Sequence, residues 1–290
     1  PTTKLIRSPT SDVGLCIEIA WLGKLADMTD ETEAAPGALP NLETWGLDDK
    51  VVMITGAASG IGAATARLAA ADGAHVIVTD LPTSAGQEVA DEIGGTFVAL
   101  DVTSSDSWRS LADGLGKLDI AILNAGVEFR DPADFSVTPD DPATWNLDNY
   151  HRATNVNIDG VALGMHALVP VFDRQGGGAI TVTASLAGLV PWTPDPIYSM
   201  TKWAVVGLVR ASATSLRMKN ITINAVCPGG VATPMTRVFD DSVPRGMAEP
   251  AHIGRAHLTI ATSGQTGRVI KGVAGHDHAP HFFAEVINTY

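Results

Sequence analysis

Short runs of β-branched and aliphatic residues alternate with longer amphipathic stretches from Lys50 onward. This alternation is typical of βαβ units, in which a helix joins two parallel strands. The predicted strands are residues 51–55, 74–80, 95–101, 118–124, 178–184, 221–226 and 268–273. The predicted helices are residues 61–71, 84–93, 105–115, 148–172, 197–218 and 250–262. We therefore predict an α/β fold with a doubly wound, seven-stranded parallel sheet and helices on both faces.

The composition excludes several classes of protein. The 290 residues are 45% hydrophobic and 18% charged, which is enough to bury a large core. The chain has 19 basic and 32 acidic residues, a net charge of −13 that repels phosphate backbones and anionic lipids. We expect neither a nucleic-acid nor a membrane partner. Its two cysteines, Cys16 and Cys227, are too few for a disulfide framework or a four-ligand zinc site, so we expect a cytoplasmic protein.

The two ends of the chain differ from this regular pattern. An apolar stretch at residues 13–22 is interrupted by Glu18 and is too short for a membrane span. We expect residues 1–47 to form an N-terminal extension, of which residues 1–27 can be deleted without loss of activity or change of oligomer size. Residues 48–275 are then the main domain, and residues 276–290 are a C-terminal tail.

A glycine-rich turn, Thr55 to Gly62, follows the first predicted strand and leads directly into a helix. Glycines let the backbone approach a pyrophosphate, which the free N–H groups of a helix N-terminus attract. The alternative is that these glycines form only a tight structural turn and bind no ligand. Asp80 ends the second strand, where a carboxylate accepts hydrogen bonds from the adenosine ribose and repels a 2′-phosphate. The pattern predicts a Rossmann-type fold that binds NAD in preference to NADP.

Tyr198 and Lys202 are four residues apart at the start of a predicted helix and therefore lie on one face of it. An ammonium group beside a phenol favours the phenolate and brings its pKa, ordinarily about 10, toward the range useful for acid–base catalysis. Taken alone, such a pair is more often found on a protein surface. The sequence around the pair decides between these two interpretations.

Several motifs, in this order, resemble those of the short-chain dehydrogenase/reductase family over roughly residues 48–275. They are TGAASGIG at 55–62, Asp80, Asp101-Val102, Asn124-Ala125-Gly126, NIDG at 157–160, Ser185, Tyr198 with Lys202, and Pro228-Gly229 with Thr233. The resemblance implies that Tyr198 is the general acid/base and that Lys202 lowers its pKa and holds the nicotinamide ribose. It also implies that Ser185 orients the substrate oxygen and that Asn157 supports a proton relay.

The same resemblance implies a nicotinamide cofactor, and Asp80 favours NAD. Asn124 would stabilise the central sheet beside the cofactor, and Pro228 to Thr233 would cover the nicotinamide. The implied cofactor contacts are Gly56, Ser59, Gly60, Ile61, Gly62, Asp80, Asp101, Val102, Asn124, Ala125, Gly126, Tyr198, Lys202, Pro228, Gly229, Val231 and Thr233.

Apolar residues dominate the segments that form the pocket walls in this family. The candidate pocket residues are Leu186, Val190, Trp192, Ile197, Met235 and Phe239. Few fixed charges accompany them, so we expect a hydrophobic secondary alcohol or its ketone as substrate, cyclic or steroid-like. Trp192 fits a pocket wall and ordinary packing equally well.

Two segments depart from the family pattern. Residues 130–146 are rich in proline and acids and fit a solvated loop or a substrate-side flap. The tail holds His276, His278 and His281, whose spacing gives no regular ligand geometry, so we expect no metal site. We expect the tail to pack at a subunit interface through Phe282 and Phe283.

The predicted helices 148–172 and 197–218 are apolar on more than one face. By resemblance they pair across a two-fold axis in a homodimer or homotetramer. Two other functions remain open at this point: an NADPH-dependent carbonyl reductase, and a non-catalytic protein that senses a dinucleotide. The complete set of four catalytic residues argues against the sensor, and Asp80 argues against the reductase.

Overall fold

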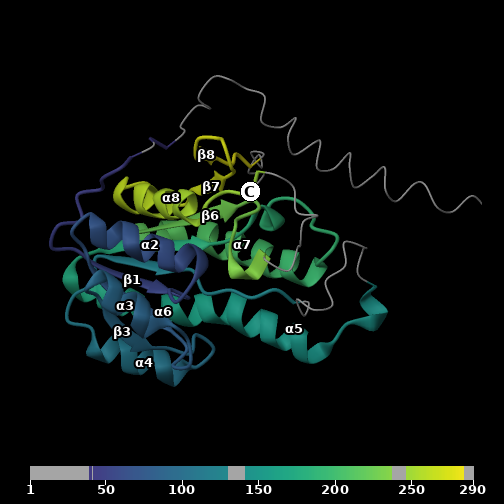
Figure 1. Cartoon of the computed structure of the whole chain (residues 1–290), viewed down its shortest axis with the longest axis horizontal. Coiled ribbons are helices and arrows are strands. Elements are labelled where there is room, and N and C mark those ends of the chain that lie inside the picture. The colour runs from purple at the N-terminus through teal and green to yellow at the C-terminus, as the bar shows by residue number, and fades with distance from the viewer. Residues whose placement is uncertain (1–38, 41, 130–140, 237–245, 284–290) are drawn as a thin grey trace, which may run out of the picture. The chain divides into compact units, whose positions relative to one another are not determined.

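A single eight-stranded sheet organises the structure, a computed structural model that describes residues 39–40, 42–129, 141–236 and 246–283. The chain divides into two units, residues 1–37 and 38–290, and every described residue belongs to the second. The strand order is β3-β2-β1-β4-β5-β6-β7-β8 (Figure 1). The strands are β1 (Val51–Thr55), β2 (His75–Asp80), β3 (Thr96–Ala99), β4 (Ile120–Leu123), β5 (Gly178–Thr183), β6 (Ile221–Pro228), β7 (Val269–Gly272) and β8 (Ala279–Pro280).

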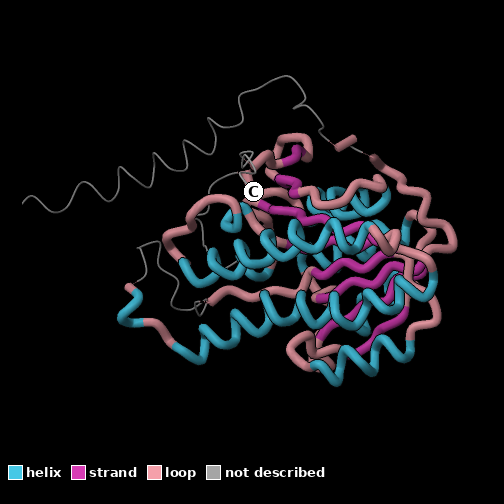
Figure 2. The backbone as a smooth tube through the Cα atoms, turned by 180° about the vertical axis from the view of Figure 1, so that it is seen from behind, coloured by secondary structure: helices cyan, strands magenta, loops and turns pink. Residues whose placement is uncertain are grey.

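Helices cover both faces of this sheet (Figures 1 and 2). They are α2 (Gly60–Ala71), α3 (Gly86–Ile93), α4 (Ser105–Gly114), α5 (Leu147–Thr154), α6 (Gly160–Gln175), α7 (Pro196–Arg217) and α8 (Pro250–Thr262). One hydrophobic cluster packs α2, α3 and α8 against one face, and another packs α4, α6 and α7 against the other. Alternate strand residues divide between the clusters, as Val52 and Met53 do. The predicted doubly wound Rossmann-type fold is confirmed.

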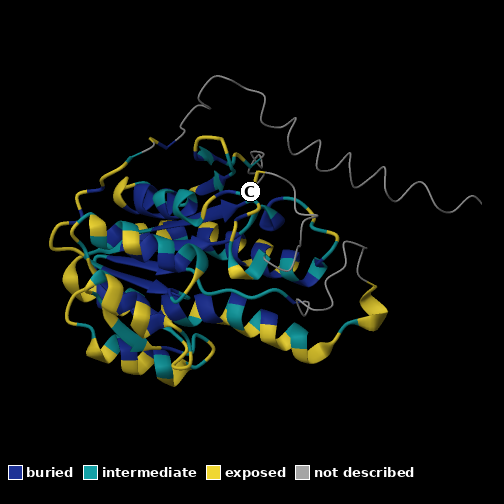
Figure 3. Ribbon diagram, viewed as in Figure 1, coloured by how far each residue is buried: buried dark blue, intermediate teal, exposed yellow. Residues whose placement is uncertain are grey.

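Burial follows the layers. The central strands are almost entirely buried, the edge strand β3 is exposed or half-buried, and the other exposed residues gather mainly on the outward sides of the helices (Figure 3). The central strands β1 and β4 are buried on both faces, which explains why their sequences are continuous apolar runs rather than alternating ones.

The eighth strand corrects the predicted seven-stranded parallel sheet. Strand β8 pairs antiparallel with β7 at the sheet edge, and His281 N donates to Val269 O at 2.7 Å. A strand of two residues that ends in proline has no local sequence signal. The tail also packs within its own subunit, since the Arg210 guanidinium on α7 lies 3.6 Å from the centroid of the Phe283 ring. Phe282, the other expected interface residue, is exposed.

The predicted helix 148–172 is divided into two in the structure. Helix α5 ends at Thr154, a π-helical turn covers Asn155–Asp159, and α6 begins at Gly160. A π turn inserts an extra residue into the helix and is frequent at functional sites. Here it contains Asn157, whose side chain bonds to a neighbouring loop rather than to solvent.

The described part of the expected N-terminal extension also packs on the domain. Trp45 is buried, and its Nε1 donates to Thr259 Oγ1 of α8 at 2.9 Å. Asp72 Oδ2 accepts from the backbone N–H groups of Trp45 and Leu47. Residues 1–27 and most of the 130–146 loop lie outside the described residues. The described end of that loop has a short 3₁₀ turn, Pro142–Thr144, before α5.

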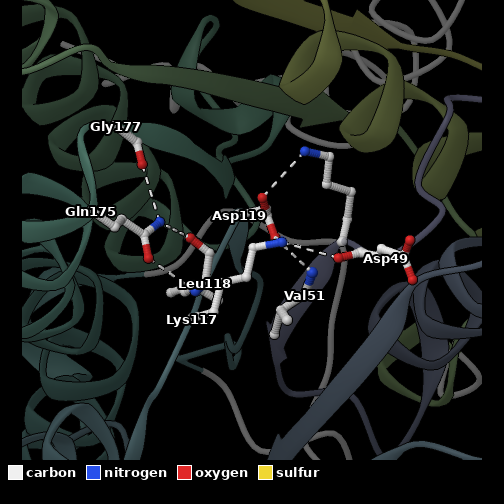
Figure 4. Close-up of polar contacts among 8 residues, drawn as sticks. Asp49, Val51, Lys117, Leu118, Asp119, Gln175 and Gly177 are labelled. Carbon is white, nitrogen blue, oxygen red and sulfur yellow. Dashed lines mark hydrogen bonds and ion pairs between the residues drawn. The ribbon is translucent and has the colours of Figure 1, made fainter.

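A polar network fixes the amino ends of the central strands (Figure 4). Asp119 accepts from Val51 N at 2.9 Å and pairs with Lys117 Nζ at 3.0 Å and Lys50 Nζ at 3.4 Å. Gln175, at the end of α6, bonds to both the N–H and the carbonyl of Leu118. The network therefore joins β1, β4 and α6 at the amino ends of the strands, opposite the carboxyl ends where the site lies.

Candidate active site

Four chain segments meet at the carboxyl ends of the central strands. Strand order reverses between β1 and β4, and ligands of doubly wound sheets bind at such a switch point. The segments are the glycine-rich turn after β1, residues 124–129 after β4, Ser185 after β5, and residues 228–233 at the end of β6. Most of the predicted site residues lie on these four segments.

The turn after β1 has the geometry that an anion site requires. Gly56 has φ +64°, and a Cβ at Gly62 would lie 2.3 Å from Gly56 O, so a side chain at either position would be strained or excluded. Ser59, at the N-cap of α2, makes no side-chain cap hydrogen bond. The first N–H groups of α2 are therefore not capped by Ser59, and they suit the pyrophosphate of a dinucleotide.

The segment Pro228 to Thr233, which is expected to cover the nicotinamide, lies against this turn. A Cβ on Gly60 would lie 3.2 Å from Thr233 Cγ2, so the segment after β6 crosses directly over the turn. Gly229 N donates to Gly272 O at 2.9 Å, and Val231 is buried and bridges to Ala248. These contacts fix the segment at both of its ends.

Two acids lie where the adenosine end of a dinucleotide is expected. Asp80 Oδ2 accepts from Ala58 N at 2.9 Å, and its Oδ1 accepts from Leu81 N at 2.8 Å. The Asp80 carboxylate is thus held beside the glycine-rich turn. Asp101 Oδ1 accepts from the N–H and hydroxyl of Thr103, while Val102 packs close to Gly160.

Asn124 connects three strands beside the site. Its Nδ2 donates to Thr55 O at 3.0 Å, and its Oδ1 accepts from Thr183 Oγ1 at 2.9 Å. His257 of α8 bonds to Thr183 through Nε2 and to Thr181 through Nδ1. Because the Thr183 hydroxyl donates to Asn124, His257 Nε2 is the donor to Thr183 and carries the proton. Burial lowers the pKa of His257 to about 3, so the imidazole is neutral.

Tyr198 and Lys202 lie on the first turns of α7. Asp195 caps this helix, since its Oδ1 accepts from Tyr198 N at 2.8 Å. Lys202 is buried, its Nζ donates to Thr183 O at 3.0 Å, and it lies 5.5 Å from the centroid of the Tyr198 ring. Burial lowers the pKa of Lys202 to about 8. The structure thus brings the predicted pair together.

Asn157 joins the π turn to both the β4 loop and α7. Its Oδ1 accepts from Val127 N and its Nδ2 donates to Val127 O, each at 2.8 Å. Its Nδ2 also donates to Thr201 Oγ1 at 3.0 Å. A Cβ on Gly126 would lie 3.4 Å from both Asn157 Oδ1 and Lys202 Nζ, so these two side chains flank Gly126.

Ser185 and several charges set the pKa of Tyr198. Burial raises the pKa of the phenol well above its usual value, and hydrogen bonding with the Ser185 hydroxyl opposes that rise. Negative charge at Glu128 and Asp195 raises the pKa further. Without a ligand Tyr198 is therefore a protonated phenol at neutral pH.

Sequence reasoning missed Glu128, Asp195 and Cys227. Asp195 precedes Pro196 and the α7 helix, which is a recognisable N-cap signal. Glu128 is the second residue after the Asn-Ala-Gly motif, so its closeness to the site was also open to inference. Burial, followed by the charge of Asp195, raises the pKa of Glu128 to about 7. Cys227 is a buried free thiol whose pKa burial raises to about 12.

The predicted pocket residues differ in how far they are buried. Leu186 packs partly against the main core, and Ile197 is buried in a small cluster with Phe129 and Ala153. Val190, Trp192 and Met235 are half-buried. Phe239 lies outside the described residues.

Two searches of the described ranges complete the survey. No group of three or more His, Cys, Asp or Glu side chains is placed to hold a metal ion in the described part of the chain. No described helix combines the length and the apolar character needed to cross a bilayer.

Comparison with known proteins gives consistent matches. The profile of the family described as "short chain dehydrogenase" matches residues 50–243. Trans-4-hydroxycyclohexanecarboxylate dehydrogenase of Sinomonas cyclohexanicum is 36% identical, over 65% of this chain and 74% of that one. Cyclohexanol dehydrogenase of Acinetobacter sp. (strain SE19) is 35% identical, over 67% of this chain and 78% of that one. The crystal structure of 3-ketoacyl-(acyl-carrier-protein) reductase from Brucella melitensis complexed with NADH superposes with a TM-score of 0.71 at 28% identity, covering 79% of this chain and 98% of that one.

Proposed function

The chain belongs to the short chain dehydrogenase family, and on this basis we propose that it is an NAD-dependent oxidoreductase for a hydrophobic secondary alcohol or its ketone. The observation that carries the proposal is the meeting of Tyr198, Lys202, Ser185 and Asn157 beside an uncapped helix N-terminus. A protein that only sensed a dinucleotide would have no use for this acid–base group.

In this proposal Tyr198 accepts the proton of the substrate hydroxyl during oxidation and returns it during reduction. Ser185 shares a hydrogen bond with the phenol and holds the substrate oxygen next to it. The ammonium of Lys202 lies over the phenol ring and stabilises the phenolate. The nicotinamide, when bound, supplies the hydride acceptor or donor.

Asn157 and Lys202 would hold the path by which the proton leaves the site. Both side chains flank Gly126, and Lys202 Nζ bonds to the carbonyl of Thr183 rather than to a carboxylate. Its burial lowers the pKa to about 8, so the ammonium is within reach of deprotonation near neutral pH. We propose that Lys202 therefore relays the Tyr198 proton as well as lowering the tyrosine pKa.

The proposed cofactor is NAD. The turn after β1 fits the pyrophosphate, because side chains are excluded there and the helix N-terminus is not capped by Ser59. Asp80, held by Ala58 N, presents negative charge where a 2′-phosphate would lie. We expect a larger kcat/KM with NAD than with NADP, and we expect Asp80→Ser to narrow the difference. A preference for NADP in the unmodified protein would favour the alternative, an NADPH-dependent carbonyl reductase.

The proposed substrate is a cyclic secondary alcohol. In this proposal the half-buried side chains of Leu186, Val190, Trp192 and Met235 form the apolar walls of the substrate site, and two relatives are named for cyclohexanol-type substrates. We further propose a homodimer or homotetramer, because Met200 and Trp203 on α7 are 41% and 45% exposed. The low cysteine count supports a cytoplasmic location.

The decisive experiment is an absorbance assay at 340 nm with cyclic alcohols, linear alcohols, polyols and hydroxy acids. We expect cyclohexanol-type substrates to be oxidised with NAD. Tyr198→Phe should lower kcat by roughly 10²–10⁴-fold while NADH binding is retained, because only the proton acceptor is removed. Cofactor binding without turnover in either protein would favour the sensor, and turnover of polyols or charged acids alone would contradict the substrate class.

A further inference from the structure

Glu128 is a carboxyl group beside the proposed reaction centre that the proposed mechanism does not use. The loop that carries it is fixed on both sides. Asn157 bonds to the N–H and carbonyl of Val127, and Asp195 Oδ2 accepts from Phe129 N at 3.1 Å. The position of Glu128 is therefore set by the same two side chains that anchor the π turn and cap α7.

The guanidinium group that bonds to this loop is directed at its backbone. Arg152 of α5 donates through Nη2 to the carbonyls of Glu128 and Phe129, each at 3.3 Å. Within residues 39–40, 42–129, 141–236 and 246–283, no hydrogen bond or ion pair reaches the Glu128 carboxylate. A partly buried carboxyl with no cationic partner among the described residues is a candidate for a functional role.

Glu128 also acts electrostatically on the catalytic tyrosine. Its charge is one of the causes that raise the Tyr198 pKa, so the carboxylate lies within electrostatic range of the phenol. A substrate bound with its oxygen at Tyr198 and Ser185 would extend into this same field. The rest of the pocket offers apolar side chains, which distinguish substrates by shape more than by charge.

We propose that Glu128 determines the charge specificity of the substrate site: it selects alcohols that carry a cationic hydrogen-bond donor and rejects those that carry a carboxylate. The proposal rests on the proposed function and deepens it by naming the substrate class. An ammonium on the substrate would give Glu128 the partner that the described structure lacks. A substrate carboxylate would instead be repelled by the negative charge of Glu128.

The test compares three ring alcohols of similar shape: trans-4-aminocyclohexanol, cyclohexanol and trans-4-hydroxycyclohexanecarboxylate. The kcat/KM of each is measured with NAD at pH 8, where the amine is cationic and the carboxyl groups are ionised, in the wild type and in Glu128→Gln. We expect the amine-to-acid ratio of kcat/KM to fall by about a hundredfold in the variant, about tenfold from each charged substrate. Asp113→Asn, an acid-to-amide change on the exposed side of α4, should leave the ratio unchanged.

A second measurement separates this inference from the proposed function. Binding of the three alcohols to the protein–NADH complex is followed by NADH fluorescence, with Glu128→Ser as a further variant in case the glutamine protein misfolds. Loss of the amine preference in binding, without turnover in any protein, would support the role of Glu128 and overturn the proposed enzyme. Turnover of cyclohexanol with an unchanged amine-to-acid ratio in the variants would overturn the role of Glu128 alone. A uniform loss for all three substrates would mean that Glu128 has only a structural role and would also overturn the inference.

Discussion

Tyr198 lies between groups with opposite effects on its pKa. Burial and the nearby acids Glu128 and Asp195 favour the neutral phenol, while the Ser185 hydrogen bond favours the phenolate. Proton acceptance during alcohol oxidation requires the phenolate. The balance at this one residue therefore sets the pH range in which the protein can oxidise an alcohol.

The pH dependence of catalysis should reveal this balance. Because the pKa of Tyr198 is raised, kcat/KM for cyclohexanol oxidation should increase with pH across the alkaline range, whereas ketone reduction should decrease. Glu128→Gln removes a negative charge beside the phenol, which lowers the Tyr198 pKa. We expect the rise in oxidation to move to lower pH by about one unit, as measured between pH 6 and 10. A move to higher pH would contradict this assignment, and Asp113→Asn provides the control.

The sequence supports only part of this account at the residue scale. The four-residue spacing of Tyr198 and Lys202 predicts that they share a helix face, and the structure places them 5.5 Å apart, ring centroid to Nζ. The effect of Glu128 could not be derived in the same way, because it depends on a loop whose path is set by Asn157 and Asp195. Both of these partners are distant from Glu128 in the sequence.

At the scale of elements, strands were easier to predict than irregular features. All seven predicted strands exist, with ends that differ by a few residues, because buried β-branched runs are a strong local signal. The π turn at Asn155–Asp159 has no such signal, since its stability comes from the contacts of Asn157 with another loop. Strand β8 is determined by its pairing with β7 and not by its own two residues.

The network around Asp119 should contribute measurably to stability. Burial raises the pKa of this carboxyl, but the Val51 N–H and the charges of Lys117 and Lys50 outweigh burial and leave the pKa below its usual value. The stabilisation is therefore present above about pH 4 and is lost as the pH falls below that value. Asp119→Asn should lower the free energy of unfolding by about 1–3 kcal/mol at pH 7, measured by urea denaturation. An equal loss at pH 3 and pH 7 would contradict the electrostatic explanation.

Two histidine rings in contact hold the C-terminal segment on α8. The rings of His252 and His278 have centroids 4.2 Å apart, and each Nε2 is buried without a hydrogen-bond partner among the described residues. Burial, together with the charge of His252, lowers the pKa of His278 to about 4. Protonation therefore favours the unfolded segment, so its stability is complete above about pH 6.5 and decreases as the pH falls toward 4.

Hydrogen exchange should detect this loss. At pH 5 the β7 amides beside β8 should be less protected than at pH 7, by about 1–2 kcal/mol after correction for intrinsic exchange rates. His278→Phe, which keeps a ring but cannot be protonated, should show a smaller dependence on pH. The same dependence in both proteins would show that His278 is not the group responsible.

At the scale of the whole molecule, helix α7 joins the catalytic centre to an exposed apolar surface. Lys202 is buried, whereas its neighbours Met200 and Trp203 point outward and are 41% and 45% exposed. In the proposed homodimer or homotetramer a second subunit would cover these two side chains. The position of Lys202 would then depend on assembly through the helix that carries it.

Replacing one exposed side chain should separate the subunits. Trp203→Arg would place a charge in the proposed interface, and we expect the oligomer to dissociate to a monomer at micromolar concentration. Size-exclusion chromatography with light scattering measures the change. Arg109→Ala, on the exposed side of α4, is the matched surface control. A monomeric wild type would rule out the proposed dimer or tetramer.

Strand β8 has one more consequence, for the behaviour of shortened chains. It occupies the hydrogen-bonding side of β7, which would otherwise be a bare row of N–H and C=O groups. A chain that stopped before Ala279 would keep its proposed reaction centre but expose a template for further strands. Its first defect should be a tendency to aggregate as concentration rises, while the specific activity of the protein still in solution stays normal.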